Sequence, residues 1–155
     1  MNNLILVRHG QSHWNKERRF TGWADIDLTE QGKSEAELAG KLIKEVNSKF
    51  DAYFTSVQKR AIHTIEIILD ILNKKNSKIK KAWELNERHY GALTGLNKDE
   101  MMKKHGERQV HIWRRSFDVA PPPMEKTNPN HPSKNKAYIN IPTSKIPSCE
   151  SLKNT

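Results

Sequence analysis

The sequence has little cysteine and no long apolar run. Its 155 residues include one cysteine, Cys149, so no disulfide can form within the chain, which favours a reducing compartment. The longest apolar stretches, residues 4–7 and the interrupted run 65–72, are far shorter than the roughly 20 residues of a membrane span. Arg8 interrupts the first run too early for the apolar region of a secretory signal peptide. We therefore expect a soluble protein of the cytoplasm.

Apolar residues are also scarce in the chain as a whole. Hydrophobic residues make up 35 % of the sequence. A globular protein usually has roughly 45–50 % when glycine is included, and the seven glycines here do not close the gap. A chain of this length is expected to form one domain. The shortfall predicts that this domain, residues 1–155, is incomplete.

The charge is strongly positive, with 27 Lys and Arg against 18 Asp and Glu and a formal net charge of +9. We interpret the lysine-rich stretch 74–81 as a solvated surface. A nucleic-acid-binding protein would place aromatic residues among its basic residues, and this pattern is absent from the sequence. The arginines lie instead beside histidines and glycines. This favours a small phosphorylated ligand, and we expect neither nucleic acid nor a membrane as a partner.

Short apolar runs alternate with helical patterns in the first half of the chain. The run Leu4–Val7 predicts a buried strand, and residues 52–55 and 79–85 predict two more. Helices are predicted over 30–46 and after Ser56 as far as Leu72. This alternation predicts an α/β fold with a mostly parallel sheet flanked by helices.

The helix over 30–46 carries the clearest local signals. Thr29 is its expected N-cap, because a threonine oxygen can accept a free amide of the first turn. Five apolar residues follow helical spacing over this range. These residues are Ala36, Ala39, Leu42, Ile43 and Val46.

The second half of the chain changes character. Helices are predicted over 98–105, ending at Gly106, and over 107–117. Residues 120–149 are rich in Pro, Asn and Lys and predict a long loop. Residues 150–153 predict the start of another helix.

The triplet Arg8-His9-Gly10 follows the first predicted strand, at the end where α/β proteins bind ligands. A neutral imidazole can attack phosphorus, so His9 is a candidate nucleophile. The neighbouring guanidinium of Arg8 would bind phosphoryl oxygens, and Gly10 permits a tight turn. Taken alone, the triplet favours a structural histidine at a strand end.

Several segments together favour a different interpretation. The chain resembles the cofactor-dependent phosphoglycerate mutases of the histidine phosphatase superfamily, from about Leu4 to Thr155. The matching segments are RHGQSHWN at 8–15, RFTGW at 19–23, SVQKRA at 56–61, LNERHYG at 85–91, GLNK at 95–98 and WRR at 113–115. The resemblance implies a phosphoglycerate mutase-like fold of three layers.

The resemblance also implies roles for the matched residues. His9 would become a phosphohistidine, Glu87 would be the general acid and base, and Arg8 and Arg60 would clamp the transferring phosphoryl group. The residues that line the substrate would be Ser12, Asn15, Thr21, Gly22, Tyr90, Lys98, Arg114 and Arg115. The implied cofactor is 2,3-bisphosphoglycerate, which primes the histidine. The histidines form no metal-ligand pattern with Cys149, so we predict no metal.

The implied activity is interconversion of 3-phosphoglycerate and 2-phosphoglycerate, in glycolysis and gluconeogenesis, by a homo-oligomeric dimer or tetramer. The C-terminal third of the family pattern, with a second catalytic histidine, is missing from the sequence. We therefore expect a C-terminally truncated chain with weak or no activity. The alternatives are a residual phosphatase, in which water discharges the phosphohistidine, and an inactive remnant or binding subunit.

Overall fold

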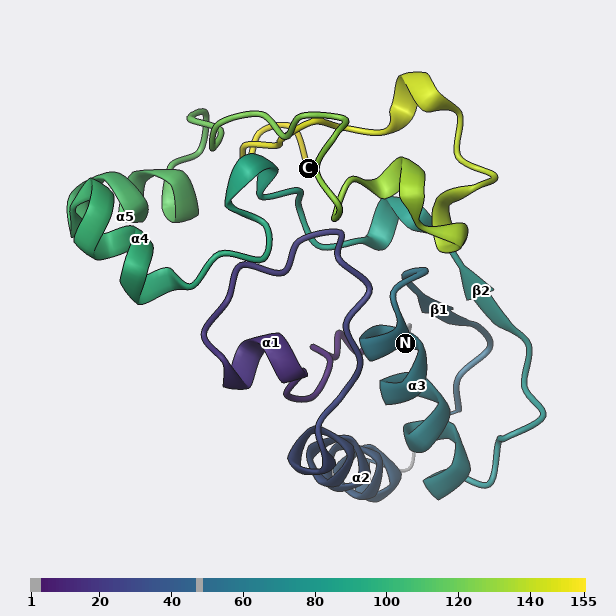
Figure 1. Cartoon of the computed structure of the whole chain (residues 1–155). Coiled ribbons are helices and arrows are strands. Elements are labelled where there is room, and N and C mark those ends of the chain that lie inside the picture. Colours follow the sequence, from purple (N-terminus) through teal and green to yellow (C-terminus); the bar gives the residue numbers. More distant parts are fainter. Residues whose placement is uncertain (1–3, 47–48) are drawn as a thin grey trace. The chain divides into compact units, whose positions relative to one another are not determined.

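A computed structural model of the chain describes residues 4–46 and 49–155 (Figure 1). These residues form two compact units. Unit 1 comprises the residues up to His13 together with Ile26–Leu85, and unit 2 comprises Trp14–Asp25 and Asn86–Thr155. Among the described residues, no helix is long and apolar enough to cross a membrane. That residues 1–155 form a single domain stays a prediction.

The elements confirm the predicted α/β class, with helices and a small parallel sheet. In chain order they are α1 (His13–Lys16), α2 (Glu30–Glu45), β1 (Tyr53–Thr55), α3 (Lys59–Ile71), β2 (Ile79–Lys81), α4 (Lys98–His105) and α5 (Glu107–Arg115). The 3-10 helices are η1 (Trp83–Leu85), η2 (Gly91–Leu93), η3 (Pro132–Lys134), η4 (Lys136–Tyr138) and η5 (Thr143–Lys145).

Unit 1 is built around α2 and α3, which pack side by side (Figure 1). Thr29 begins α2 as predicted, because its Oγ1 accepts a hydrogen bond from the Gly32 amide at 3.1 Å. The buried residues of α2 are small and recur every four positions: Gly32, Ala36 and Gly40. A Cβ on Gly40 would lie 3.0 Å from the Ile71 Cβ of α3. Small side chains therefore set the close approach of the two helices.

Two larger apolar residues, Leu42 on α2 and its C-cap Val46, lie on the exposed side of the helix. Leu42 is 53 % exposed and Val46 is 60 % exposed. Helical spacing shows that residues share a side of a helix, but it does not show which side packs. Here the close packing at Gly40 turns the small residues inward and leaves the leucine in solvent.

The sheet of unit 1 pairs β1 with β2 in parallel, and Tyr53 lies opposite Ile79. The strand predicted over 52–55 is confirmed. The strand predicted over 79–85 ends at Lys81, and the chain then forms η1.

The run Leu4–Val7 is not a strand, and the prediction of a buried strand there is wrong. Leu4 is 80 % exposed and Leu6 is 86 % exposed. An apolar run becomes a buried strand only where neighbouring strands take its main-chain hydrogen bonds. The sheet formed by the described residues contains only β1 and β2, so nothing pairs with this run.

The apolar core of unit 2 lies at α4 and α5. Its buried members are Phe20, Leu93, Met101 and Val110. Asn97 caps α4, since its Oδ1 accepts a hydrogen bond from the Asp99 amide at 2.8 Å. Gly106, with a φ of 82°, ends α4 as predicted, and α5 begins at the next residue. The end of α5 at Arg115 comes earlier than predicted.

The segment 120–149 carries η3, η4 and η5 but no long helix or strand. It is anchored through Tyr138, which is 1 % exposed and donates a hydrogen bond to the Trp23 carbonyl at 2.7 Å. Residues 152–154 form a turn and residues 150 and 151 have no regular structure, so the helix predicted over 150–153 is wrong. Two amides of this segment hold it to the rest of unit 2: Glu150 N donates to His89 O at 2.9 Å, and Lys153 N donates to Phe117 O at 2.8 Å.

Candidate active site

In unit 1, His9 is followed by a segment that is hydrogen-bonded to both α2 and α3. The Gly10 amide donates to Thr64 Oγ1 of α3 at 3.2 Å, and the next amide donates to Glu35 Oε2 of α2 at 2.7 Å. A Cβ on Gly10 would collide with the Gly32 carbonyl at the start of α2. Only glycine permits this approach. The main chain beside His9 is therefore fixed by both helices.

Both ring nitrogens of His9 have a partner. Nδ1 lies 2.7 Å from the Gly10 carbonyl oxygen, which can only accept a hydrogen bond, so Nδ1 carries the proton. Nε2 then holds the lone pair and accepts a hydrogen bond from Arg60 Nε at 3.2 Å. These contacts select the tautomer in which Nε2 is the nucleophilic nitrogen.

The surroundings keep the His9 ring uncharged. The pKa of His9 is lowered from 6.5 to about 4, first by burial of the ring and then by the positive charges of Arg60 and Arg8. The hydrogen bond with the Gly10 carbonyl opposes this shift. At neutral pH the imidazole is therefore in the form that can attack an electrophile.

The cations near His9 differ in exposure. Arg60 is fully buried at the start of α3, where the helix dipole adds partial positive charge. Arg8 is exposed. Ser12, a predicted site residue that is not a cation, is fully buried and forms an isolated antiparallel β-bridge with Leu28. Of the site residues predicted in unit 1, the structure brings His9 and Arg60 into direct contact.

In unit 2, the predicted site residues Tyr90 and Lys98 belong to a cluster of aromatic rings and cations. The rings of Phe20 and Tyr90 are 5.2 Å apart between centroids. Lys98 Nζ lies 5.8 Å from the centre of the Phe20 ring, and the Arg88 guanidinium lies 4.8 Å from the centre of the Tyr90 ring. Cations thus lie over both aromatic rings.

The predicted pair Arg114 and Arg115 ends α5, and a third arginine contacts the same turn. Arg88 Nη2 donates to the carbonyls of Trp113 at 2.9 Å and Arg114 at 2.6 Å. Arg88 is 5 % exposed. The sequence reasoning included Arg88 in a matching segment but gave it no role, because a motif does not show which way a side chain points.

The remaining predicted residues of unit 2 include Thr21, Gly22, Glu87 and Asn15. Gly22, with a φ of 53°, lies so close to the segment after Glu87 that a Cβ would be 3.0 Å from the Tyr90 nitrogen. Thr21 is 3 % exposed. Glu87 and Asn15, which lies on α1, are half-buried. The structure therefore gathers Gly22, Tyr90 and the arginine-rich end of α5 around Arg88.

Unit 2 also holds buried polar side-chain atoms that lack a hydrogen-bond partner. They include Thr21 Oγ1, both amide atoms of Asn86, Arg88 Nη1, His89 Nε2 and Thr94 Oγ1. Buried polar groups are normally paired with protein or water, so such atoms are suited to a ligand or to ordered water. The pKa of His89 is lowered to about 4 by burial, with a smaller contribution from His131.

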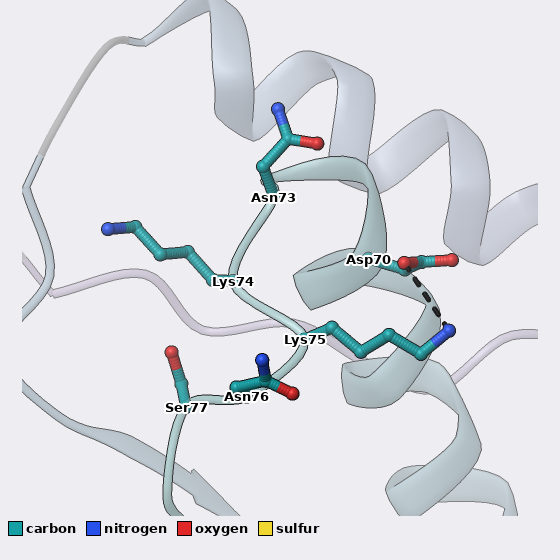
Figure 2. Close-up of a pocket in the computed structure, with 6 residues that line it drawn as sticks. All are labelled: Asp70, Asn73, Lys74, Lys75, Asn76 and Ser77. Atoms are coloured by element: carbon teal, nitrogen blue, oxygen red, sulfur yellow. Dashed lines mark ion pairs between the residues drawn. The ribbon is translucent and has the colours of Figure 1, made fainter.

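A surface hollow of about 470 Å³ lies at the end of α3 in unit 1 (Figure 2). It is lined by Asp70, Asn73, Lys74, Lys75, Asn76 and Ser77, and includes no predicted site residue. Figure 2 shows Lys75 reaching toward Asp70, with Nζ and Oδ1 3.7 Å apart, while Lys74 points away. Both lysines are exposed, which agrees with a solvated surface at 74–81.

Comparison with known proteins reveals close relatives. Two curated proteins named 2,3-bisphosphoglycerate-dependent phosphoglycerate mutase, from Pelagibacter ubique (strain HTCC1062) and Hydrogenobaculum sp. (strain Y04AAS1), are 56 % and 55 % identical to this chain. Each comparison covers 100 % of this chain but only 65 % and 63 % of the relatives. The chain thus spans less than two thirds of their length.

A solved structure agrees with this result. The crystal structure of phosphoglycerate mutase from Bacillus anthracis str. Sterne is similar with a TM-score of 0.62 and 26 % identity. The similarity covers 71 % of this chain and 50 % of that chain.

The family match covers most of the chain. Residues 4–129 match the histidine phosphatase superfamily (branch 1), and this range includes both His9 and Arg60. The resemblance expected from the sequence is confirmed by this match and by the curated relatives. The chain therefore belongs to branch 1 of the histidine phosphatase superfamily.

Proposed function

We propose that the chain is a phosphoglycerate mutase that interconverts 3-phosphoglycerate and 2-phosphoglycerate through a phosphohistidine at His9. One observation carries the proposal: His9 is uncharged, and its Nε2 lone pair accepts a hydrogen bond from the buried Arg60. The names of the two curated relatives support the choice of substrate.

The proposed reaction consists of two transfers. In the first, the Arg60 N–H turns from His9 Nε2 to a phosphoryl oxygen, and the freed Nε2 lone pair attacks phosphorus. The N–P bond forms, the ester P–O bond breaks, and the leaving oxygen takes a proton from Glu87. In the second, Glu87 takes the proton from a free hydroxyl of phosphoglycerate as that oxygen attacks phosphorus, and the N–P electron pair returns to Nε2. Glu87 acts once as an acid and once as a base.

The arginines stabilise the charge of the phosphoryl group. Phosphoryl transfer depends mainly on positioning and on charge stabilisation. Arg60 Nε lies 3.2 Å from the nucleophilic nitrogen, so its charge lies next to the position of the transferring group. Arg8 is the proposed second clamp on the same oxygens.

The substrate carries both a phosphate and a carboxylate, so it requires several cations and polar donors. We assign the anionic groups to Lys98, Arg114 and Arg115. The other proposed lining residues are Ser12, Asn15, Thr21, Gly22 and Tyr90. The unpaired Oγ1 of Thr21 supports this assignment, because a buried hydroxyl gains from a ligand oxygen.

The residues present also fit an anionic primer. The unpaired Asn86 amide and Thr21 hydroxyl offer buried donors in the same unit as Lys98, Arg114 and Arg115. When bound, 2,3-bisphosphoglycerate supplies the phosphoryl group that first loads His9. The proposal assigns no metal, and the described residues contain no group of three His, Cys, Asp or Glu that could hold one.

We place the proposed enzyme in glycolysis and gluconeogenesis, in the cytoplasm, as a homo-oligomeric dimer or tetramer whose protomer is one domain. The names of the curated relatives support the pathway. The single cysteine of the chain supports a reducing compartment.

A phosphatase is the second candidate, and the superfamily match favours it. Water would then attack the phosphohistidine in place of a glycerate hydroxyl, and inorganic phosphate would be released. The contact between His9 and Arg60 serves both reactions, so the product distinguishes them.

The test follows 3-phosphoglycerate by phosphorus NMR in the presence of the chain and 2,3-bisphosphoglycerate. The mutase proposal predicts a 2-phosphoglycerate signal that is lost in His9→Asn and kept in His111→Asn, an exposed histidine of α5. Inorganic phosphate without 2-phosphoglycerate would favour the phosphatase. No turnover of any kind would favour an inactive chain or a binding subunit.

A further inference from the structure

Arg88 is a buried cation at the end of α5 for which the proposed reaction has no role. Its Nη2 donates to the carbonyls of Trp113 and Arg114, at 2.9 Å and 2.6 Å. Both carbonyls lie in the last turn of α5, where no later amide of the helix can reach them. A guanidinium at this position also opposes the partial negative charge of the helix end. Arg88 therefore caps α5 with a charged side chain.

The same guanidinium contacts the segment that carries the proposed acid and base. It lies 4.8 Å from the centre of the Tyr90 ring. Glu87 directly precedes Arg88 in the chain. The neighbouring His89 is fixed by Glu150, whose Oε2 accepts the His89 amide at 2.7 Å. One buried side chain thus joins the Glu87–Tyr90 segment to the end of α5.

Capping this turn has a consequence for Arg114 and Arg115. The direction in which a helical side chain leaves the backbone follows from the backbone itself. Arg88 fixes the carbonyls of Trp113 and Arg114, so it also fixes where the side chains of Arg114 and Arg115 begin. A frayed last turn would let these two cations vary in position.

We propose that Arg88 is a positioning residue, which holds Arg114 and Arg115 in the geometry that binds the anionic substrate without binding the substrate itself. This inference rests on the proposed function, because it gives the arginine pair a substrate to bind. A lysine cannot take over the role fully. Its ammonium is a point charge, whereas the planar guanidinium can stack on Tyr90 while Nη2 donates to the helix end.

The test compares Arg88→Met and Arg88→Lys with a matched control, Arg108→Met. Arg108 is an exposed arginine on the same helix, so the control removes the same charge without touching the cap. The first measurement is hydrogen exchange at the amides of residues 113–116 in the ligand-free chain. Loss of a charged hydrogen bond predicts exchange roughly tenfold faster in Arg88→Met, an intermediate effect in Arg88→Lys, and none in Arg108→Met.

The second measurement separates positioning from general loss of stability. Arg88→Met should raise KM for 3-phosphoglycerate roughly tenfold and change kcat much less, since the arginine pair binds the ground state and transition state alike. A less stable protein would instead lose active fraction, with an unchanged KM. In the background of Arg114→Met and Arg115→Met, removing Arg88 should add almost nothing to KM.

Two results overturn the inference. One is unchanged exchange at residues 113–116 in Arg88→Met, or in Arg88→Lys if the methionine variant does not fold. The other is a KM effect that persists without Arg114 and Arg115, because Arg88 would then contact the substrate directly. A wild-type chain without turnover contradicts only the proposed function. Calorimetric binding of 3-phosphoglycerate then replaces KM, and equal or absent binding in wild type and Arg88→Met overturns the inference.

Discussion

The proposed nucleophile of unit 1 and the proposed anion-binding residues of unit 2 have different kinds of surroundings. Both ring nitrogens of His9 have partners, Gly10 and Arg60. In unit 2, Thr21 Oγ1 and the side-chain amide of Asn86 are buried without one. An unpaired buried group costs free energy that a ligand can recover. The contrast indicates that the proposed nucleophile is fixed and uncharged before a ligand arrives, whereas a ligand can complete the hydrogen bonds of the proposed recognition residues.

The two units also differ in how they hold these residues. In unit 1 the main chain beside His9 is fixed by the backbone contact between Gly10 and Gly32. In unit 2 the end of α5 is fixed by the charged side chain of Arg88. A rigid backbone suits a nucleophile such as the proposed His9, which must approach a single phosphorus atom. A charged cap on the end of α5 suits Arg114 and Arg115, which are proposed to bind the same anionic substrate.

The largest expected effect concerns charge stabilisation in unit 1. Arg60→Met should lower kcat by roughly 100-fold to 1000-fold, as loss of a transition-state donor does, with a smaller change in KM. Steady-state kinetics with 3-phosphoglycerate measures both values. The control is Lys59→Met, which removes an exposed cation from the residue before Arg60 and should leave kcat unchanged. If Arg60→Met raised KM alone, as expected for Arg88→Met, the functional contrast between the units would be lost.

The next effect concerns the backbone contact beside His9. Gly10→Ala should lower the free energy of unfolding by about 3 kcal/mol, because the new Cβ collides with the Gly32 carbonyl and backbone cannot yield cheaply. Gly40→Ala meets the Ile71 side chain at 3.0 Å. Alanine is more favourable than glycine in a helix by about 1 kcal/mol, and this gain should offset much of the free energy that the crowding costs. Urea unfolding compares the two variants, and equal losses would contradict a special role for the Gly10 contact.

A pH effect of similar or smaller size should occur in both units. The pKa values of His9 and His89 are about 4 in the folded chain, against an ordinary value of 6.5. Between these two pH values the unfolded chain binds more protons than the folded chain, so the free energy of unfolding rises with pH. The stabilisation that the two histidines contribute is present above pH 6.5 and is lost as pH falls toward 4. After allowance for partial solvent screening, each histidine should contribute about 2 kcal/mol.

Urea unfolding at pH 4.5 and pH 7 checks this effect in the wild type, His9→Asn and His89→Asn. Each substitution should reduce the difference in unfolding free energy between the two pH values. A difference that is unchanged in His9→Asn would show that the ring is not held uncharged by its surroundings.

The smallest effect concerns the exposed side of α2. Leu42→Gln should change the free energy of unfolding by less than about 0.5 kcal/mol, because Leu42 lies in solvent. Ala36→Leu, on the face against α3, should cost about 1–3 kcal/mol through overpacking. Thermal and urea unfolding measure both values. A larger loss for Leu42→Gln would mean that the leucine side of the helix is buried.

Local signals in the sequence predicted some helices well and others not, since the helix predicted over 150–153 does not form. The N-cap Thr29 and the helical spacing after it predicted the limits of α2 closely, and Gly106 predicted the end of α4. These signals are reliable because caps and stops act over a few residues. The strand expected at Leu4–Val7 was wrong because a strand depends on partners elsewhere in the chain. The same limit explains Leu42, whose burial depends on which side of α2 meets α3.

The candidate site was predicted only in part. The resemblance identified His9 and Arg60, and the structure brings them into contact. The tautomer of His9 could not be predicted, because it depends on the Gly10 carbonyl. The contact of Arg88 with α5 was missed because it joins residues that are far apart in the sequence. The roles of all these site residues stay predictions.

His9 is the proposed nucleophile, and mapping the phosphorylated residue tests this assignment. The chain would be incubated with 2,3-bisphosphoglycerate, digested at alkaline pH to preserve phosphohistidine, and analysed by peptide mass spectrometry. We expect one phosphoryl group, located on His9 and absent from His9→Asn. Phosphate on another residue, or an unmodified chain under conditions in which a full-length mutase is labelled, would contradict it.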